Sequence, residues 1–255
     1  MTGRHETASC SEEESHTITL QIGGTADPLR LALPSGNVPA EAMLPALRTI
    51  TDAVVGRGIA VTHAKGRSIS CKSGCAACCR HMALISDIEA RALAQVVAEM
   101  PEPRRNVVRA RFAAASQRME QAGLAELARH ADHLPPDRLR ALATDYFKLR
   151  IDCPFLEDER CMVYDHRPLV CRKLVVTSPA AWCIDPADDR VQPLPLPKIA
   201  AAILLVTSDE DPPRPAAVPL PLVLDWAAAD RAAPPRRGAD QWMQRFVERL
   251  ASCGS

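Results

Sequence analysis

Apolar and polar residues alternate twice near the N-terminus, first over residues 18–22 and again over residues 29–33. A period of two is typical of β-strands that bury one face. Gly23-Gly24 and Asp27-Pro28 separate the two stretches, and these residue types favour turns. The pattern therefore predicts an N-terminal β-hairpin. The polar and charged residues 1–16 ahead of it are expected to form a disordered tail.

From about residue 40 onward the apolar period lengthens to that of an α-helix. The sequence Ser86-Asp87-Ile88-Glu89 has the pattern of a capping box, which would start one of these helices, and Pro101 would end it. A last amphipathic stretch runs from Trp242 to Leu250. Helices are predicted at about residues 40–57, 87–100, 104–123, 136–149 and 242–250.

Residues 186–221 are rich in proline, and we expect them to be irregular because each proline removes a hydrogen-bond donor. The apolar run 199–206 within them is a strand or a short helix, between which its period does not decide. Residues 220–229 are expected to form a short helix.

The predicted fold class is mainly α with a small N-terminal β-hairpin, with an irregular cysteine-rich, metal-binding segment packed on the helices. Residues 17–185 are expected to form a helical domain that contains the cysteine motif at residues 69–185. Residues 186–255, the proline-rich segment and the last helix, are expected to pack on the same domain.

Charge and composition argue against two classes of partner. The 255-residue chain has a formal net charge of zero and only 4% aromatic residues, so it has neither a basic excess to hold a phosphate backbone nor the usual aromatic platform for single strands. Its most apolar run is far shorter than a bilayer requires, and its N-terminus lacks the apolar core of a signal peptide. We therefore expect a cytoplasmic protein with no nucleic-acid or membrane partner. Thiols stay reduced there, so the ten cysteines are better explained as metal ligands than as disulfides.

Four cysteines lie within nine residues, at Cys71, Cys75, Cys78 and Cys79. On an α-helix they would share one face, within an arc of roughly 100°. If Gly74 breaks the first turn, the last three keep that relation. Several thiols aimed at one point suit a soft metal ion or an iron–sulfur cluster. The alternative is that they are small buried apolar residues.

A second group consists of Cys153, Cys161 and Cys171. Residues 157–159 are expected to form a turn between the first two. Pro168 suits the first turn of a helix, which would place Cys171 near the N-terminal end of that helix. Amide groups there would favour its thiolate form.

Arg167 and Arg172 flank Cys171, and a thiolate-held cluster carries the negative charge that arginines would balance. The alternative is that both arginines are solvated or pair with Asp165 and Glu157. Tyr164 is expected either to donate a hydrogen bond to a sulfur or simply to pack.

Other candidate ligands carry less weight. Cys183 stands alone in the sequence but is a plausible extra ligand. His81 and His166 could bind zinc, although a lone histidine is more often a surface or supporting residue. Cys10 and Cys253 lie near the chain ends and are expected to be unrelated to the site.

Seven cysteines exceed the four that a single zinc ion or a single four-iron cluster uses. Either some thiols are spare, or a second metal shares them. The predicted ligand set is Cys71, Cys75, Cys78, Cys79, Cys153, Cys161 and Cys171.

The two groups together match a family pattern. The motif Cys71-x3-Cys75-x2-Cys78-Cys79-Arg80 is followed by Cys153-Pro154-Phe155-Leu156, by Cys161 and Tyr164, and by Arg167-Pro168-x2-Cys171-Arg172. In this order the residues resemble the YkgJ-type cysteine-cluster family. Its CxxCxxCC domain is described as zinc- or iron-chelating, and its members are often called Fe-S oxidoreductases. Many members have two residues, not three, between the first two cysteines, which sets Cys71 apart.

The resemblance implies metal chelation over residues 69–185 and brings no assigned reaction. A flagellin lysine methylase has a similar cysteine pattern, which implies that such a cluster can serve an enzyme. Three hypotheses follow. The favoured one is an iron or iron–sulfur protein with a redox role and a redox partner protein. The alternatives are a structural zinc site without catalysis and a metal-dependent group-transfer enzyme.

Overall fold

A computed structural model describes residues 13–22, 25–185, 188–229 and 235–253. Its α-helices are α1 (Leu44–Ala64), α2 (Asp87–Glu99), α3 (Glu102–Gln121), α4 (Ala125–Arg129), α5 (Pro136–Lys148), α6 (Leu169–Lys173), α7 (Ile199–Leu205), α8 (Val223–Ala228) and α9 (Ala239–Cys253). Its strands are β1 (Glu13–Ile22), β2 (Thr25–Pro34), β3 (Asn37–Pro39), β4 (Leu84–Ser86), β5 (Leu156–Glu157), β6 (Arg160–Cys161), β7 (Ala217–Pro219) and β8 (Arg236–Gly238). Short 3₁₀ helices are η1 (Ala40–Met43), η2 (Ala77–Arg80), η3 (Ala131–His133), η4 (Tyr164–His166), η5 (Ala180–Ile184) and η6 (Leu220–Leu222). The predicted fold class, mainly α with an N-terminal strand pair, is confirmed.

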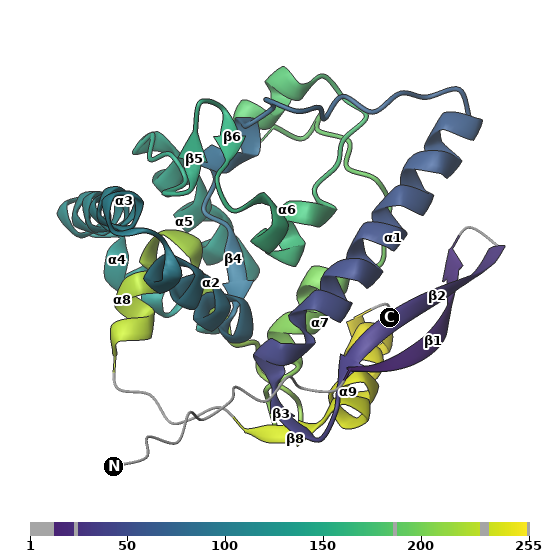
Figure 1. Cartoon of the computed structure of the whole chain (residues 1–255). Helices are drawn as coiled ribbons and strands as arrows, with labels where there is room; N and C mark the ends of the chain where they lie inside the picture. The colour runs from purple at the N-terminus through teal and green to yellow at the C-terminus, as the bar shows by residue number, and fades with distance from the viewer. Residues whose placement is uncertain (1–12, 23–24, 186–187, 230–234, 254–255) are drawn as a thin grey trace, which may run out of the picture.

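The N-terminal hairpin forms as predicted, with β1 antiparallel to β2. Ile22 pairs with Thr25, so Asp27 and Pro28 lie inside β2 and do not separate the strands. β1 begins at Glu13, so the tail predicted at residues 1–16 ends too late, and residues 1–12 lie outside the described part. Figure 1 shows the hairpin beside α1, against which Leu31 and Leu33 are buried.

The helix predicted at residues 40–57 is longer than expected. It opens as the 3₁₀ turn η1 and continues as α1 to Ala64. Gly58 lies inside α1, where a Cβ atom would stand 2.4 Å from Cδ2 of Leu196. The glycine therefore leaves room for the side chain of Leu196 against this helix, and the helix continues past it.

Helices α2, α3 and α5 follow the predicted periods closely. The capping box of α2 is present: the Ser86 hydroxyl accepts from the Glu89 amide, and the Glu89 carboxylate accepts from the Ser86 amide. The left half of Figure 1 holds these helices together with α4 and α8. Neither the five-residue α4 nor the three-residue strands were expected, because elements this short show no period.

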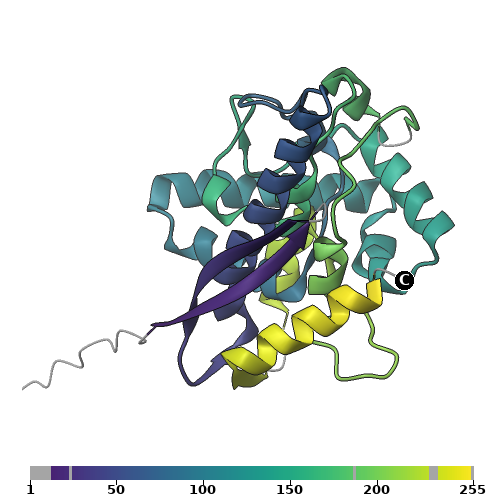
Figure 2. The same cartoon turned by 90° about the vertical axis from the view of Figure 1, so that its right-hand side faces the viewer.

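The C-terminal third packs against α1. Residues 199–205 are helical as α7, which decides between the two alternatives for that run. Helix α9 lies across α7, as Figure 2 shows, and Trp242 of α9 donates from Nε1 to the Val38 carbonyl at 2.9 Å. Two antiparallel strand pairs, β3 with β8 and β4 with β7, also join distant parts of the chain.

The core consists of three hydrophobic clusters. The first lies between the hairpin, α1, α7 and α9; the second involves α2, α3, β4, β7 and α8; the third lies around α4, α5 and the end of α3. The second cysteine segment is anchored in all three. Ile151 lies in the third cluster, Phe155 and Val163 in the second, and Leu169 in the first. Among the described helices, none has the length and apolar character to cross a bilayer.

Candidate metal centre

The first cysteine group does not form the predicted helical stripe. Gly74 has a positive φ of 82°, and the amide of Cys75 closes a turn onto the Lys72 carbonyl at 2.9 Å. Only Ala77–Arg80 is helical, as the 3₁₀ turn η2. The left-handed conformation at Gly74 is incompatible with a continuous helix, so the four thiols are arranged by a loop and one short turn.

The second group is positioned by a tight hairpin. Strands β5 and β6 pair Leu156 with Cys161, and the two connecting residues, Asp158 and Glu159, have φ values of 48° and 56°. Positive φ at both central residues is typical of a type I′ turn, which matches the twist of the flanking strands. The predicted turn at residues 157–159 is therefore confirmed.

Cys171 lies in the middle of α6, a helix of five residues. Pro168 is its N-cap residue, close to the predicted position. The amide of Leu169, the first helical residue, donates to Oε1 of Glu89 at 2.6 Å. Glu89 is 2% exposed, and its other oxygen accepts from the amide and hydroxyl of Ser86. This buried carboxylate therefore joins the start of α2 to the start of the helix that carries Cys171.

Main-chain hydrogen bonds join the two cysteine groups. The amide of Cys153 donates to the carbonyl of Cys79 at 2.8 Å, and the amide of Ser70 donates to the carbonyl of Val176 at 3.0 Å. The amide of Val176 in turn donates to Sγ of Cys71 at 3.4 Å. Such a bond to sulfur favours its ionised form.

Arg80 adds a side-chain clamp between the groups. Its terminal nitrogens donate to both carboxylate oxygens of Glu159, at 2.6 and 3.2 Å. Its Nε lies 3.0 Å from the carboxylate of Asp152, and one terminal nitrogen also donates to the carbonyl of Ala76. The guanidinium therefore holds the first cysteine loop against the hairpin of Cys161 and the residue next to Cys153.

Neighbouring thiols strongly affect one another at Cys78 and Cys79. The hydrogen bond from the Cys79 thiol, helped by the positive charge of nearby Arg167, lowers the pKa of Cys78 to about 6. The same hydrogen bond, together with burial, raises the pKa of Cys79. Cys78 is therefore the thiol most ready to ionise near neutral pH, and Cys79 is the proton donor beside it.

Burial has the opposite effect on the second group. It raises the pKa of Cys153 to about 12, and the nearby thiols of Cys161 and Cys78 add to that shift. Burial also raises the pKa values of Cys161 and Cys171, while the positive charge of Arg167 opposes the shift in both. A bound cation would favour the thiolate form of each.

The thiols form one electrostatic neighbourhood. Cys78 interacts with the largest number of other thiols, because its charge contributes to the raised pKa of five cysteines: Cys71, Cys79, Cys153, Cys171 and Cys183. The charge of Cys75 likewise raises the pKa of Cys71, and the charge of Cys161 raises the pKa of Cys153. All seven predicted ligands therefore lie in one region of the molecule, although they come from a loop, a 3₁₀ turn, a hairpin and a helix.

The two flanking arginines differ in what they contact. Arg172 pairs with the carboxylate of Asp52 on α1 at 2.7 Å and donates to the carbonyls of Tyr164, Asp165 and Arg167. Arg167 donates to the carbonyl of Cys171 and lies 5.1 Å from the ring centroid of Tyr164. Arg172 therefore binds the cysteine segment to α1. The positive charge of Arg167 favours the thiolate forms of Cys78, Cys161 and Cys171, and that of Arg172 also acts on Cys161.

The alternative pairing of these arginines with Asp165 and Glu157 is not the one adopted. Arg172 contacts the main-chain carbonyl of Asp165, and Glu157 pairs with Arg104 and Arg111 instead. Tyr164 is 62% exposed, packed under Arg167.

The additional candidates separate clearly. His166 is exposed on η4. His81 meets the ring of Phe147 edge-on, with 5.9 Å between ring centroids, and burial lowers its pKa. Cys183 is buried on η5, which packs against η2; burial raises its pKa, and the nearby thiols of Cys71, Cys78 and Cys75 add to the shift. Cys183 therefore lies beside the first cysteine group. It carried less weight as a candidate because no other cysteine stands near it in the chain.

Two further residues that organise the site were not predicted. Arg80 follows directly after the double cysteine, and Glu89 belongs to the capping box, so both stand in patterns that the sequence does show. Their long-range contacts, to Glu159 and to Leu169, depend on how the chain folds.

The donor set fits a soft metal. The side chains gathered here are thiols, which select zinc, iron–sulfur clusters or copper(I) over hard cations. Within the described ranges, no three histidine, cysteine, aspartate or glutamate side chains converge closely enough to hold an ion as they stand. Some thiols would therefore have to reorient to bind one.

Residues 70–183 match a protein family named CxxCxxCC, whose description is "Putative zinc- or iron-chelating domain". The matched range begins one residue before Cys71 and ends at Cys183, so it includes both cysteine groups and all but the last residue of η5. It spans a little under half of the 255 residues. Neither the curated proteins nor the solved structures include a match to this chain.

Proposed function

Because residues 70–183 belong to the CxxCxxCC family of zinc- or iron-chelating domains, we propose that the protein binds iron through these cysteines, as an iron–sulfur centre with a redox role. Such a centre, when bound, exchanges single electrons with a partner. Cys75, Cys78, Cys153, Cys161 and Cys171 are the ligands on which the proposal chiefly rests. The expected partner is a redox protein.

The observation that carries this proposal is the number and kind of donors in one neighbourhood. Seven predicted thiol ligands and Cys183 are linked electrostatically around Cys78. A mononuclear zinc site uses four ligands. A single four-iron cluster also uses four, so the larger, thiol-only set favours a centre with more than one metal ion, which thiolate-held iron–sulfur clusters provide.

The surrounding residues suit a negatively charged centre. Arg167 supplies positive charge to Cys78, Cys161 and Cys171. Arg172 is occupied by Asp52 and three carbonyls, so its role is to hold η4 and α6 in place. Because thiolate ligation requires reduced cysteines, we place the protein in the cytoplasm, where thiols stay reduced.

A structural zinc site is the second candidate, and one feature favours it. The segment between α5 and α6 contains only the two-residue strands β5 and β6 and the turn η4. A segment with so little regular structure would be stabilised by a metal cross-link, because the free energy of metal binding then contributes to the free energy of folding. Zinc would hold this segment against the first cysteine loop without any electron transfer.

Metal analysis of protein purified without oxygen separates the two candidates. We expect iron with acid-labile sulfide and a broad absorption band near ~400 nm, as thiolate-held clusters give. Zinc in a colourless protein would contradict the redox proposal and support the structural one. Iron without sulfide would contradict the cluster and indicate a non-haem iron centre.

A further inference from the structure

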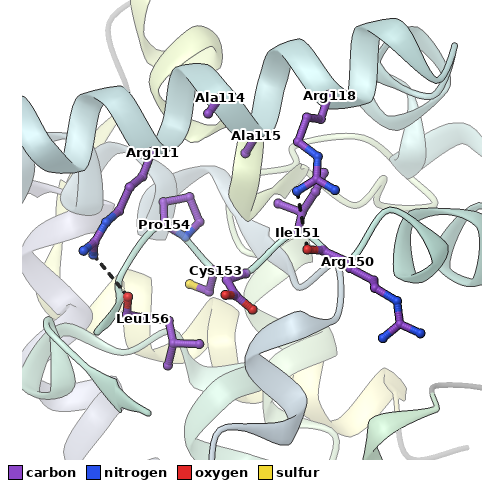
Figure 3. Close-up of a pocket in the computed structure, with 10 residues that line it drawn as sticks. Arg111, Ala114, Ala115, Arg118, Arg150, Ile151, Cys153, Pro154 and Leu156 are labelled. Carbon is purple, nitrogen blue, oxygen red and sulfur yellow. Dashed lines mark hydrogen bonds between the residues drawn. The ribbon is translucent and has the colours of Figure 1, made fainter. Parts of the chain in front are cut away.

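A cleft opens directly beside the proposed centre. It has a volume of about 350 Å³ and lies between one face of α3 and residues 150–156 (Figure 3). In Figure 3, the side chains of Arg111 and Arg118 extend from α3 on either side of Pro154 and Cys153. Ala114 and Ala115 lie on α3 between these two arginines, and their small side chains leave the cleft open. The cleft therefore reaches Cys153, one of the proposed ligands.

The lining is strongly basic for its size. Three arginines, Arg111, Arg118 and Arg150, line it together with a single carboxylate, Asp152. That carboxylate is already paired with Arg80 outside the cleft, at 3.0 Å. Arg80 also pairs with Glu159, so it offsets only part of the Asp152 charge, but the three arginines of the lining still outnumber its single carboxylate.

The three arginines differ in how many hydrogen bonds and ion pairs their side chains already form. Arg111 donates to the carbonyl of Leu156 at 3.1 Å and approaches Glu157 at 3.5 Å. Arg118 donates only to main-chain carbonyls, those of Leu149 and Arg150. A guanidinium has five N–H groups, so both side chains keep donors for a ligand. The charge of Arg118, unlike that of Arg111, is not compensated by any carboxylate among its described partners.

Arg150 lies at the end of the cleft and has an uncommon backbone conformation. Its φ is 50°, in the left-handed region that non-glycine residues seldom adopt. Within the part of the chain that the structure describes, neither Arg118 nor Arg150 forms an ion pair with a carboxylate. Arg118 and Arg150 are therefore two exposed cations without a described carboxylate partner at one end of the cleft, and the Arg150 side chain is directed outward from its rim (Figure 3).

We propose that this cleft binds a small molecule carrying a carboxylate or phosphate group and brings it next to Cys153. The volume lies in the range of small-molecule sites, and guanidinium groups bind both anions through paired N–H donors. The role of the anion at a metal centre rests on the function proposed above, whereas its binding to the arginines does not. Arg111 and Pro154 would form the side walls and Arg118 would hold the anionic group, joined by the exposed side chain of Arg150, which runs outward from the rim in Figure 3 and would turn inward on binding.

A calorimetric titration of the full-length protein as purified, with benzoate and with phenyl phosphate, tests the proposal. The two probes share a ring and differ in the anionic group, so the tighter one identifies which group the cleft prefers. We expect saturable binding that weakens with salt, because exposed charge pairs are screened. Absence of saturable binding by both probes would overturn the proposal.

Matched variants locate the binding. Arg150→Ala removes a cation that makes no described hydrogen bond from its side chain, and we expect binding to weaken about two- to fivefold. Arg150→Lys keeps the charge and should retain most of the affinity. Arg138→Ala removes an exposed cation from the other end of α5 and should change nothing. Equal affinity in all three variants would place the binding elsewhere and refute the cleft.

A double variant, Arg118→Gln with Arg150→Ala, should lower affinity at least about tenfold, because both uncompensated charges are gone. Glutamine can still donate to the carbonyls that Arg118 contacts. If the double variant does not fold, the single Arg150→Ala result still decides. Metal content measured on the same samples keeps the two proposals separate: anion binding without iron would contradict only the redox function, and iron without anion binding would contradict only the cleft.

Discussion

The main-chain amide of Cys153 donates a hydrogen bond of 2.8 Å to the carbonyl of Cys79. These two cysteines belong to different groups that are widely separated in the sequence, and the bond uses neither thiol. The contact therefore does not depend on metal or on thiol ionisation. Together with the Arg80 clamp, it joins the two groups through contacts that leave every thiol available to an ion.

Hydrogen exchange of the Cys153 amide tests this adjacency. In protein stripped of metal by a chelator, we expect this amide to exchange slowly, because it is hydrogen-bonded beneath a partly buried loop. The amide of Lys72, in the exposed turn before Gly74, should exchange fast and serves as the reference. Fast exchange at Cys153 without metal would mean that the ion itself brings the groups together.

Serine substitutions identify which cysteines hold the metal. Cys161→Ser should lower the metal content and the free energy of unfolding, because a hydroxyl is a poor ligand for soft metals. Cys183→Ser should do the same if the eighth thiol takes part. Cys253→Ser, near the end of α9, is the control and should leave the metal unchanged. Full metal content in Cys161→Ser would remove that residue from the ligand set.

Substitution of Arg80 should loosen the contact between the two groups. Arg80→Ala removes the fork to Glu159 and the contact with Asp152, and we expect a loss of about 1 kcal/mol, since this charge cluster is partly exposed. Arg80→Lys keeps the charge but not the paired geometry, so it should fall between Ala and the original residue. Urea unfolding gives the energy, and the rate of metal release to a chelator gives the effect on the site. Unaltered release in Arg80→Ala would argue against the clamp.

The buried Glu89 should make stability depend on pH. Burial raises its pKa above the ordinary value of 4.5. The folded state then binds the proton more tightly than the unfolded state, so the free energy of unfolding falls as pH rises from about 4.5 through the raised pKa. Urea unfolding at several pH values measures this slope.

Two variants separate the charge of Glu89 from its hydrogen bonds. Glu89→Gln should lose the pH slope, although it is less stable overall because its amide nitrogen cannot accept. Glu89→Ala should lose about 2–4 kcal/mol, since the amides of Leu169 and Ser86 remain buried without an acceptor. A slope that persists in Glu89→Gln would assign the pH dependence to another group.

Thiol reactivity in metal-free protein should single out Cys78. Its pKa of about 6 means that it is mostly thiolate at pH 7, so its alkylation rate should rise with pH to a midpoint near that value. Cys79→Ala removes the hydrogen-bond donor and should shift the midpoint upward, whereas Cys79→Ser retains a donor and should shift it less. Mass spectrometry of peptides alkylated with iodoacetamide gives each rate. A midpoint unaffected by Cys79→Ala would exclude the proposed hydrogen bond.

The sequence predicts those parts of the fold that follow from local patterns. Helix α3 buries Val108, Phe112, Ala115 and Met119 at helical spacing, and α2 starts at its capping box. Both features lie within one turn or a few turns of the chain. The turn at Asp158 and Glu159 is equally local, and it was predicted at the correct place.

The remainder depends on contacts that no local pattern reveals. The helical stripe at Cys71–Cys79 was wrong because one residue, Gly74, adopts a left-handed conformation that ends the periodicity. Strand β4 pairs with β7 over only three residues, from distant parts of the chain. Cys183 reaches the first cysteine group through the packing of η5 on η2, which becomes visible only once the chain is folded.

The segment that supplies the second set of thiols is anchored in all three hydrophobic clusters, through Ile151, Phe155 and Leu169 among others. Ion binding and the stability of the whole molecule are therefore thermodynamically linked, because the ion binds only chains in which these anchors are in place. A truncation far from any cysteine, such as Trp242→Ala in α9, would raise the apparent dissociation constant of the ion by reducing the competent fraction. Metal occupancy in this protein consequently reports on the integrity of its entire core.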